Sequence, residues 1–478
     1  MKHSQQVSGN SFFSNSLFIF LARFFPTLAS TFVIILFSRA LSPESYGRYQ
    51  NFWVQLSMLY PIACFGLYAA ALTYPKEVIK AIWLSFKARH HLIFGMWVCL
   101  FATLFATLQY HRAHIPFFIP FFFLVSFAIS FIAESLLIVR KSFTVLIVVN
   151  ITYAFLFCVL HWLMICKGFS LQMLFYYLLF IAAARAVIFI LFVRKDYKQL
   201  AITPDHSNID VPQIRSLWLH LGAYDILQVV FSWIDKFIVT LALSVSVSAI
   251  YFNGAQNIPF LPILLSAAGS AMLMQLAIPG NANEKTYTLS VINHSAGLLS
   301  SIVFPLFFFF ILFRYELFRV VLSDAYLPSV PIFLVSVMVL PLKAYNFTTV
   351  LQRYHKGAII NTGALLDVII ACALMYPMYC WLGLPGIALS FVITTYLQAA
   401  FYLIYTARLL DTSIFTLIPF INWGLKLIVF AIIFIVIHYV LKRHFTDVFT
   451  LISGLSLTCI IIVISLGREL KLNRTTDV

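Results

Sequence analysis

The sequence predicts an all-α polytopic membrane protein with about fourteen transmembrane helices, and three observations support this class. Hydrophobic residues make up 62% of the 478 positions, and the mean hydropathy is +0.97. A soluble protein of this length cannot bury so much apolar surface, so most of the surface must face lipid. The apolar residues are grouped in long runs, and no segment shows the alternation typical of a membrane β-barrel.

A helix needs about 20 apolar residues to cross the hydrocarbon core of a bilayer. Fourteen runs approach that length, and they cover residues 17–38, 52–72, 92–109, 117–139, 143–165, 171–193, 217–243, 250–276, 289–313, 328–351, 359–379, 385–407, 418–441 and 448–466. The first run shows no small-residue cleavage site, so we interpret it as a membrane helix. The connections are short, with the longest between Arg194 and Arg215, and they leave no room for a soluble catalytic domain.

The distribution of Lys and Arg predicts the orientation of the chain. With the N-terminus inside, eighteen of the 31 basic residues fall in inner segments and seven in outer loops, so both termini are expected in the cytoplasm. The net charge of +15 is therefore an orientation signal that contacts anionic lipid headgroups, and nucleic-acid binding is excluded as a function. Almost all of the seven Cys lie in apolar runs, and they lack metal-ligand spacing, so no metal site is expected.

An internal repeat divides the chain. Residues 16–50 and 216–251 both open with Ser-Leu, carry a polar residue early in the span and close on Ala-Leu-Ser. Each copy then continues to a small residue, a spacer and a Tyr, at Tyr49 and at Tyr251. Since each copy opens a block of six spans, we expect two pseudo-symmetric six-helix halves around a central cavity. The expected domains are 1–200, 201–410 and a pair of additional helices with a cytoplasmic tail at 411–478.

Polar residues line one face of the seventh predicted span. At about 100° per residue, all of them share an arc of roughly 140°; we call them the polar stripe, which consists of Asp225, Gln228, Ser232, Asp235, Lys236 and Thr240. A charge near the bilayer centre costs roughly 2.5–3.5 kcal/mol, so such residues need water or a partner. The stripe predicts a helix that lines a hydrated cavity. For Asp235 and Lys236, a structural ion pair and snorkelling to the interface remain alternatives.

Further polar residues lie inside other predicted spans. Arg23 shares a face of the first span with Thr27 and Ser30, and Pro26 permits a bend there. Arg185 lies near the middle of the sixth span, too deep to snorkel easily, and is expected to face the cavity. Glu134, six residues before Arg140, is either a cavity residue or a structural partner.

The second half carries a similar set. Lys343 and Asp367 are intermediate cases between cavity and structural positions. Asn253 and Asn257 belong to a polar cluster at the start of the eighth span, where hydrogen bonding between helices explains them as well as substrate contact does. Lys426 lies outside the twelve-span unit and is expected to be structural.

Four stretches resemble the polysaccharide-biosynthesis flippases, the Wzx-type oligosaccharide flippases of the multidrug/oligosaccharidyl-lipid/polysaccharide (MOP) exporter superfamily. They are "FSRALSPESYGRYQ", "IDKFIVTLALSVSVSAIY", "LSDAYLPSVPIF" and "WLGLPGIALSFVI", and their order and spacing extend over essentially the whole chain. The second stretch has Ala249 where the family usually has Gly. The resemblance implies a MATE/MOP-like fold of two six-helix halves with two extra C-terminal helices.

The resemblance also implies a non-enzymatic function. A flippase of this type would move an undecaprenyl-diphosphate-linked glycan across the bacterial inner membrane, by alternating access coupled to H⁺ or Na⁺, for O-antigen, capsule or exopolysaccharide synthesis. The expected substrate-binding residues are Arg23, Arg185, Lys236, Lys343, Gln228, Ser232, Asn253 and Asn257. The expected ion-coupling residues are Asp225, Asp235, Asp367 and Glu134. No other cofactor is expected, and the polysaccharide polymerase machinery is a candidate partner beside the lipid-linked glycan and anionic lipids.

Three other functions remain open at this stage. A glycan polymerase or membrane glycosyltransferase would be expected to carry a sizeable extramembrane loop, which this sequence lacks. A drug/cation antiporter would use the same fold with a net acidic cavity, whereas the deep cations here favour an anion. A lipid II flippase would carry an Arg-rich first helix, which this chain only partly has.

Overall fold

The computed structural model of the chain is built of helices, and the residues that it describes contain no β-strand. Those residues are 9–73, 79–80, 86–198, 211–256, 258, 261–262, 265, 268–269, 272, 276, 284–354 and 356–476. They form two compact units, Met1–Val245 (unit 1) and Ser246–Val478 (unit 2). Ten described helices are long and apolar enough to cross a membrane, which confirms the all-α polytopic class.

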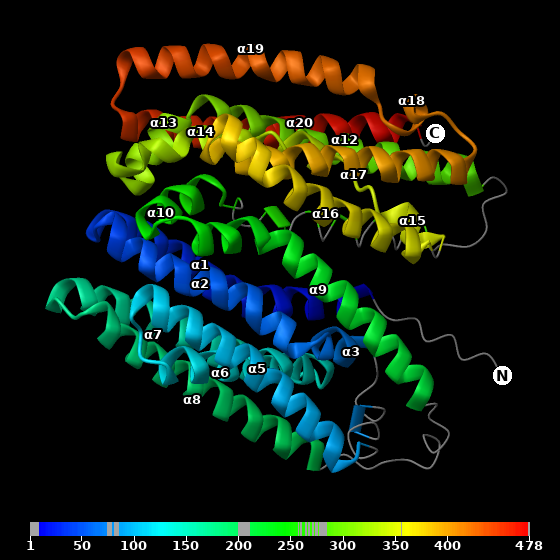
Figure 1. The fold of residues 1–478 in the computed structure, drawn as a ribbon. Helices are drawn as coiled ribbons and strands as arrows, with labels where there is room; N and C mark the ends of the chain where they lie inside the picture. Colours follow the sequence, from blue (N-terminus) through cyan, green and yellow to red (C-terminus); the bar gives the residue numbers. More distant parts are fainter. Residues whose placement is uncertain are drawn as a thin grey trace, which may run out of the picture. The chain divides into compact units, whose positions relative to one another are not determined.

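Unit 1 contains eight described helices, and its consecutive long helices alternate in direction (Figure 1). They are α1 (Gly9–Ala40), α2 (Pro43–Cys64), α3 (Leu67–Thr73), α5 (Ala88–Ala113), α6 (Phe118–Val139), α7 (Phe143–Lys167), α8 (Leu171–Lys198) and α9 (Val211–Ala242). Helix α1 packs on α7, α6 on α5 and α8, and α9 on α2. The start of α2 explains part of the "SPESYG" stretch, because Ser42 caps the helix by accepting a hydrogen bond from the Ser45 backbone and Pro43 opens its first turn.

Unit 2 contains longer helices joined by short, irregular ones. Its described elements are α10 (Val245–Gly254), α12 (Glu284–Leu312), α13 (Arg314–Leu317), η2 (Phe318–Leu322), η3 (Asp324–Ser329), α14 (Val330–Val337), η4 (Leu340–Ala344), α15 (Thr349–Arg353), α16 (Gly357–Leu382), α17 (Leu384–Leu410), α18 (Ile414–Leu417), α19 (Phe420–His444) and α20 (Asp447–Thr476). Helices α16 and α17 form a tight antiparallel pair, and α12 packs against both α19 and α20 (Figure 1).

The turn between α16 and α17 explains two glycines of the "WLGLPGIALS" stretch. Gly383 has a φ of +66°, a backbone conformation that residues other than Gly rarely adopt. A Cβ at Gly386 would lie 1.9 Å from the Met378 carbonyl oxygen, so the first turn of α17 reaches the end of α16 only with glycine. The closeness of this helix pair is therefore encoded in the turn itself.

Two predicted spans are not continuous helices. The predicted span 328–351 was wrong as one helix, since it is divided into α14, η4 and α15. Pro331 and Pro341 each lie in a first turn and lack the N–H that would continue a preceding helix. The predicted span 52–72 breaks between α2 and α3, where Phe65 and Gly66 both have positive φ.

Most of the remaining predicted spans are present as helices, although their boundaries differ by a few residues. Ten uninterrupted spans are described, the seventh predicted run corresponds to α9, and the eighth is described only in part. The two contact units divide the chain at residue 245, so α9 packs with unit 1. The predicted domains 1–200, 201–410 and 411–478 rest on counting spans, and they stay a prediction.

Candidate functional site

A carboxylate and two guanidiniums meet inside unit 1 from three different helices. Arg23 Nε on α1 lies 3.3 Å from Glu134 Oε1 on α6, and Arg185 Nη2 on α8 lies 3.2 Å from Glu134 Oε2. Only about a tenth of the Arg185 and Glu134 side chains is exposed, whereas 45% of the Arg23 side chain is exposed. This Arg23–Glu134–Arg185 cluster has one excess positive charge, and its accessible member is Arg23.

Aromatic rings hold both guanidiniums in place. The Arg185 guanidinium lies over the rings of Tyr153 and Phe189, at 5.0 and 5.3 Å from their centroids. Arg23 lies 5.6 Å from the ring centroid of Tyr68 and donates a hydrogen bond to its hydroxyl. Cation–π contacts of this kind contribute more when the cation is desolvated. The geometry therefore favours a fixed Arg185 and an Arg23 that presents part of its charge outward.

Pro26 contributes to the site through the backbone of α1. Because proline has no N–H, the carbonyl of Ala22, four residues earlier, has no partner of the usual helical kind. Asn150 Nδ2 on α7 donates a hydrogen bond of 3.0 Å to that carbonyl oxygen. This bond joins α1 to α7 directly beside Arg23, so the predicted bend site is also an attachment point.

The polar stripe of α9 divides into an accessible and a buried part. Gln228 and Ser232 are exposed and Asp225 is half-buried, as expected for residues beside water. Asp235 and Lys236 are buried and form an ion pair of 3.2 Å. This arrangement is compatible with the structural ion pair, one of the alternatives that the sequence leaves open for these two residues.

Thr240, the last residue of the polar stripe, belongs to a buried chain of hydrogen bonds. Gln55 Nε2 on α2 donates to Thr240 Oγ1 at 3.0 Å, and Gln109 Nε2 on α5 donates to Gln55 Oε1 at 2.9 Å. All three residues are essentially inaccessible. Thr240 thus joins α9 to two neighbouring helices, which accounts for its polarity without a ligand.

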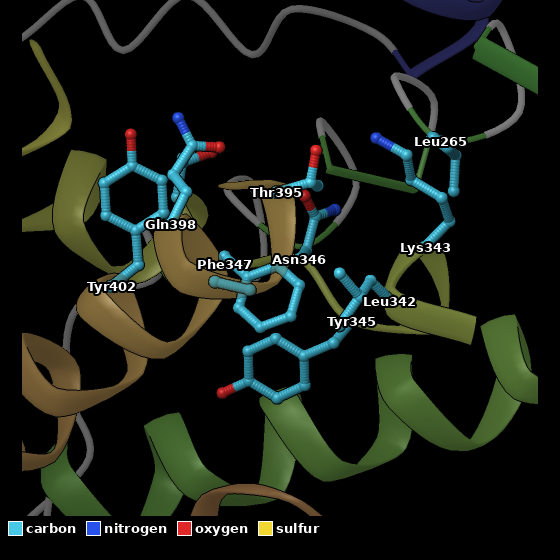
Figure 2. A pocket seen from close by; sticks show the side chains of 11 residues that line it. Leu265, Leu342, Lys343, Tyr345, Asn346, Phe347, Thr395, Gln398 and Tyr402 are labelled. Carbon is cyan, nitrogen blue, oxygen red and sulfur yellow. The ribbon is translucent and has the colours of Figure 1, made fainter. Parts of the chain in front are cut away.

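Unit 2 contains a cavity of about 230 Å³ with a mixed polar and aromatic lining. Figure 2 shows the polar ends of Lys343, Thr395, Gln398 and Tyr402 on the same side of the cavity, above the rings of Phe347 and Tyr345. The Lys343 side chain is surrounded by protein yet exposed, because it lines this hollow. Among the described residues, Lys343 forms no ion pair within 4.0 Å.

Hydrogen-bonding capacity remains open in this cavity. The Asn346 amide nitrogen is buried and has no hydrogen-bond partner among the described residues. Gln398 uses its amide nitrogen on the Gly363 carbonyl at 3.3 Å, and Tyr402 donates to the Ile360 carbonyl at 2.8 Å, so both are held by α16. Donors and acceptors arranged beside aromatic rings suit a hydroxylated or acidic ligand.

Asp367 lies beside this cavity on α16 and is 2% exposed. Neither carboxylate oxygen accepts a hydrogen bond from the described residues. Lys343 and Thr394 are near enough to influence it electrostatically, but the Thr394 hydroxyl donates to the Phe391 carbonyl at 3.2 Å. A buried carboxylate without a direct donor is costly unless it binds a proton or a cation.

Several predicted residues are not brought to these sites, and others were missed. Asn253 is 3% exposed on α10, and Asn257 lies outside the described residues. Lys426 is satisfied by Glu469 at 2.6 Å and by hydrogen bonds to α12, in agreement with its expected structural role. The sequence analysis did not identify Asn346, Thr395 and Gln398 as cavity residues. The polar residues that follow Lys343 in "LKAYNFTT" could have indicated Asn346. In the described part of the chain, no cluster of His, Cys, Asp and Glu could hold a metal ion.

The arrangement of helices defines the class of protein: an all-α, multi-pass membrane protein whose fold is similar to that of solved MATE and MurJ structures. Three solved structures carry this result, each 15% identical in sequence. An inward-facing multidrug resistance MATE family transporter of the MOP superfamily matches with a TM-score of 0.54, over 81% of this chain and 94% of its own. The lipid II flippase MurJ in an inward closed conformation matches with a TM-score of 0.57, over 94% of this chain and 97% of its own. A MATE in the straight conformation matches with a TM-score of 0.52, over 83% of this chain and 94% of its own. No protein-family model and no curated protein matches the sequence.

Proposed function

We propose that this chain is a flippase that moves an undecaprenyl-diphosphate-linked oligosaccharide from the cytoplasmic to the outer leaflet of the bacterial inner membrane, for surface polysaccharide synthesis. Both termini lie in the cytoplasm in this proposal. The observation that carries it is a pair of accessible cations: Arg23, nearly half exposed at the start of the first described span, and Lys343, exposed on η4 in a polar cavity. A cation among apolar spans is expensive unless it is compensated, and an anionic ligand would compensate these two.

The chemistry of the substrate matches these cations. A diphosphate and a glycan cannot enter hydrocarbon unaided, because each unpaired polar group costs several kcal/mol. Arg23 offers the planar donor fork that suits phosphate oxygens, and Lys343 offers a compact charge. Amide and hydroxyl groups such as Gln228, Ser232 and Gln398 replace water around sugars, while the polyprenyl tail stays in lipid.

Asp367 is the strongest candidate for ion coupling. Glu134 and Asp235 already pair with neighbouring cations, whereas Asp367 accepts no hydrogen bond from the described residues. Binding of H⁺ or Na⁺ would relieve its burial, and Lys343 is close enough to sense the change in charge. Asp225, half-buried on α9, is the second candidate.

Deletion of the gene tests the proposal. The lipid-linked oligosaccharide should accumulate on the cytoplasmic leaflet, detected by its inaccessibility to a glycosidase added to intact spheroplasts. Complementation with the wild-type gene should restore exposure, and complementation with Lys343→Gln should not. A deletion strain that exposes the glycan normally would refute the proposal.

Two other transport functions follow from the compared folds. A MATE-type drug/cation antiporter would need acidic accessible groups, and the accessible Arg23 and Lys343 argue against a cationic cargo. Lipid II transport is favoured by the 97% coverage of the MurJ chain, since its substrate is also a lipid. Rescue of a strain depleted of its lipid II flippase would support that alternative, and drug-resistance assays would support the antiporter. A glycan polymerase would instead lengthen lipid-linked glycans in detergent.

A further inference from the structure

A groove of about 490 Å³ lies at the C-terminal end of α19, away from the sites described above. It is lined by Leu312 at the end of α12 and by Ile435, His438, Tyr439, Lys442 and Arg443 of α19. Both helices are membrane spans that end at this level, so the groove lies where hydrocarbon gives way to headgroups. Figure 1 shows α19 beside α20 and α12 within unit 2.

One wall of the groove is fixed by a buried carboxylate. Glu316 on α13 is 1% exposed, and its Oε1 lies 2.9 Å from Lys442 Nζ and 3.3 Å from His438 Nε2. Burial alone would raise the pKa of Glu316, but its hydrogen bonds from His438 and Lys442 lower the pKa to about 2. The carboxylate is therefore charged, and it holds Lys442 at the mouth of the groove.

Arg443 is the second cation and has no carboxylate beside it. Its side chain is exposed, it forms no ion pair in the described part of the chain, and its guanidinium approaches only the Tyr439 hydroxyl, at 3.5 Å. Basic residues at a helix C-terminus are ordinary. The distinguishing feature here is that Lys442 and Arg443 both border a groove. Glu316 neutralises one of these two positive charges, so the net charge at the groove is +1.

An apolar track leads away from the groove along α19. Leu425, Ile428, Ile432 and Ile435 follow at helical spacing, and each is more than half exposed. Tyr439 continues this row and is also more than half exposed, where an amphipathic ring suits the interface. A phosphate ester at Arg443 and an acyl chain along this row would together match the surface.

We propose that the groove binds one anionic phospholipid, with its phosphodiester between Lys442 and Arg443 and an acyl chain along Ile435 and Ile432. The single excess charge matches a phosphodiester better than a diphosphate, so the occupant is a resident membrane lipid such as phosphatidylglycerol. The site lies in unit 2 and does not depend on the transport function proposed above.

Native mass spectrometry of the purified full-length chain tests this site, with phosphatidylglycerol and phosphatidylcholine of identical acyl chains as probes. The wild type should bind phosphatidylglycerol more tightly. Arg443→Gln should weaken that binding about 5-fold, because one Lys or Arg near a membrane surface contributes about 1 kcal/mol. Phosphatidylcholine binding should not change, and Arg443→Lys should recover most of the affinity.

The matched control is Arg48→Gln in unit 1, since 40% of the Arg48 side chain is accessible and its one ion pair among the described residues is with Glu44, at 2.7 Å. It should leave phosphatidylglycerol binding unchanged, and thermal unfolding should confirm that both variants are folded. Equal affinity for the two lipids in the wild type, or an equal loss in Arg48→Gln, would overturn the proposal. So would displacement of the lipid by millimolar inorganic phosphate, which would indicate a free-ion site, or preferential displacement by undecaprenyl diphosphate, which would indicate a substrate site.

Discussion

At the scale of single residues, Glu134 holds two guanidiniums that the sequence places 111 and 51 positions away from it. Removing the carboxylate leaves both cations without a counter-charge in a largely buried place. Removing Arg185 instead leaves the Arg23–Glu134 pair intact, so the two substitutions are not equivalent. This asymmetry gives a direct test of the cluster.

Glu134→Gln should destabilise the purified protein by about 3 kcal/mol, the usual cost of an uncompensated buried charge. Arg185→Met should cost about half as much, because one ion pair survives. Arg48→Met, which removes an exposed pair at the start of α2, should cost less than about 1 kcal/mol. Chemical unfolding in detergent measures all three, and equal losses for Glu134→Gln and Arg48→Met would contradict the account.

Asp367→Asn should separate stability from coupling. The substitution keeps the size of the side chain and removes a buried charge that lacks a donor among the described residues, so unfolding stability should rise or stay equal. Transport should lose its dependence on the proton or sodium gradient. Asp411→Asn is the control, because Asp411 is exposed and pairs with Lys285 at 3.7 Å. Unchanged gradient dependence in Asp367→Asn would exclude Asp367 from coupling.

The sequence predicted which residues are polar and deep, but not how they pair. Arg23, Arg185, Glu134, Lys343 and Asp367 were all found from their depth in apolar runs. Their partners could not be found, because contact between spans depends on rotation about each helix axis, which hydropathy does not determine. The same limit explains why Asp235 and Lys236, which share the stripe with Gln228, turned out buried.

At the scale of elements, close approach between α16 and α17 positions the cavity lining. A Cβ at Gly363 on α16 would lie 2.4 Å from a ring carbon of Tyr402, whose hydroxyl bonds to Ile360. Gly357, at the start of the same helix, has open space around it. These two glycines therefore form a matched pair for testing the contact.

Gly363→Ala should displace Tyr402 and cost about 1–3 kcal/mol, the range for an overpacked contact. Gly357→Ala should be neutral or slightly stabilising, because Ala has the higher helix propensity. Thermal unfolding of the two variants, together with transport of the lipid-linked glycan, distinguishes them. A Gly363→Ala protein as stable as Gly357→Ala would show that Tyr402 is not held by this contact.

The Glu316 contact with α19 predicts a pH window for stability. Because its folded pKa of about 2 lies below its ordinary value of 4.5, the contribution is complete above about pH 4.5 and is lost as the pH falls toward 2. Unfolding measurements between pH 6 and pH 2.5 should show this loss in the wild type. Glu316→Gln should be less stable at pH 6 and should lose less stability across the window; an unchanged pH slope would contradict the assignment.

Element boundaries also show where sequence reasoning stops. The runs at 289–313, 359–379 and 385–407 correspond to α12, α16 and α17, because long apolar runs form helices in lipid. A single internal proline, Pro305 in α12 and Pro377 in α16, does not divide these helices. The predicted span 328–351 contains three prolines, and the chain divides into three short helices there. The polar cavity lined by Lys343 and Asn346 lies at these breaks.

At the scale of the whole molecule, the chain combines a fold similar to that of MATE and MurJ structures with accessible cations in each of its two units. The fold was predictable from composition, span count and the resemblance, and the solved structures bear it out. The cargo depends on side chains such as Arg23 and Lys343, and folds of this class are shared by proteins with different cargoes. The cargo therefore requires a measurement on this chain.

Reconstitution into liposomes tests the flippase proposal most directly. Purified protein and an undecaprenyl-diphosphate-linked glycan with a fluorescent sugar label are placed in vesicles, and a membrane-impermeant quencher reports the leaflet of the label. The account predicts protein-dependent transfer between leaflets, at least 10-fold slower in Lys343→Gln than in the wild type and unaffected by Arg48→Gln. Transfer no faster than in protein-free vesicles, under either a proton or a sodium gradient, would contradict it.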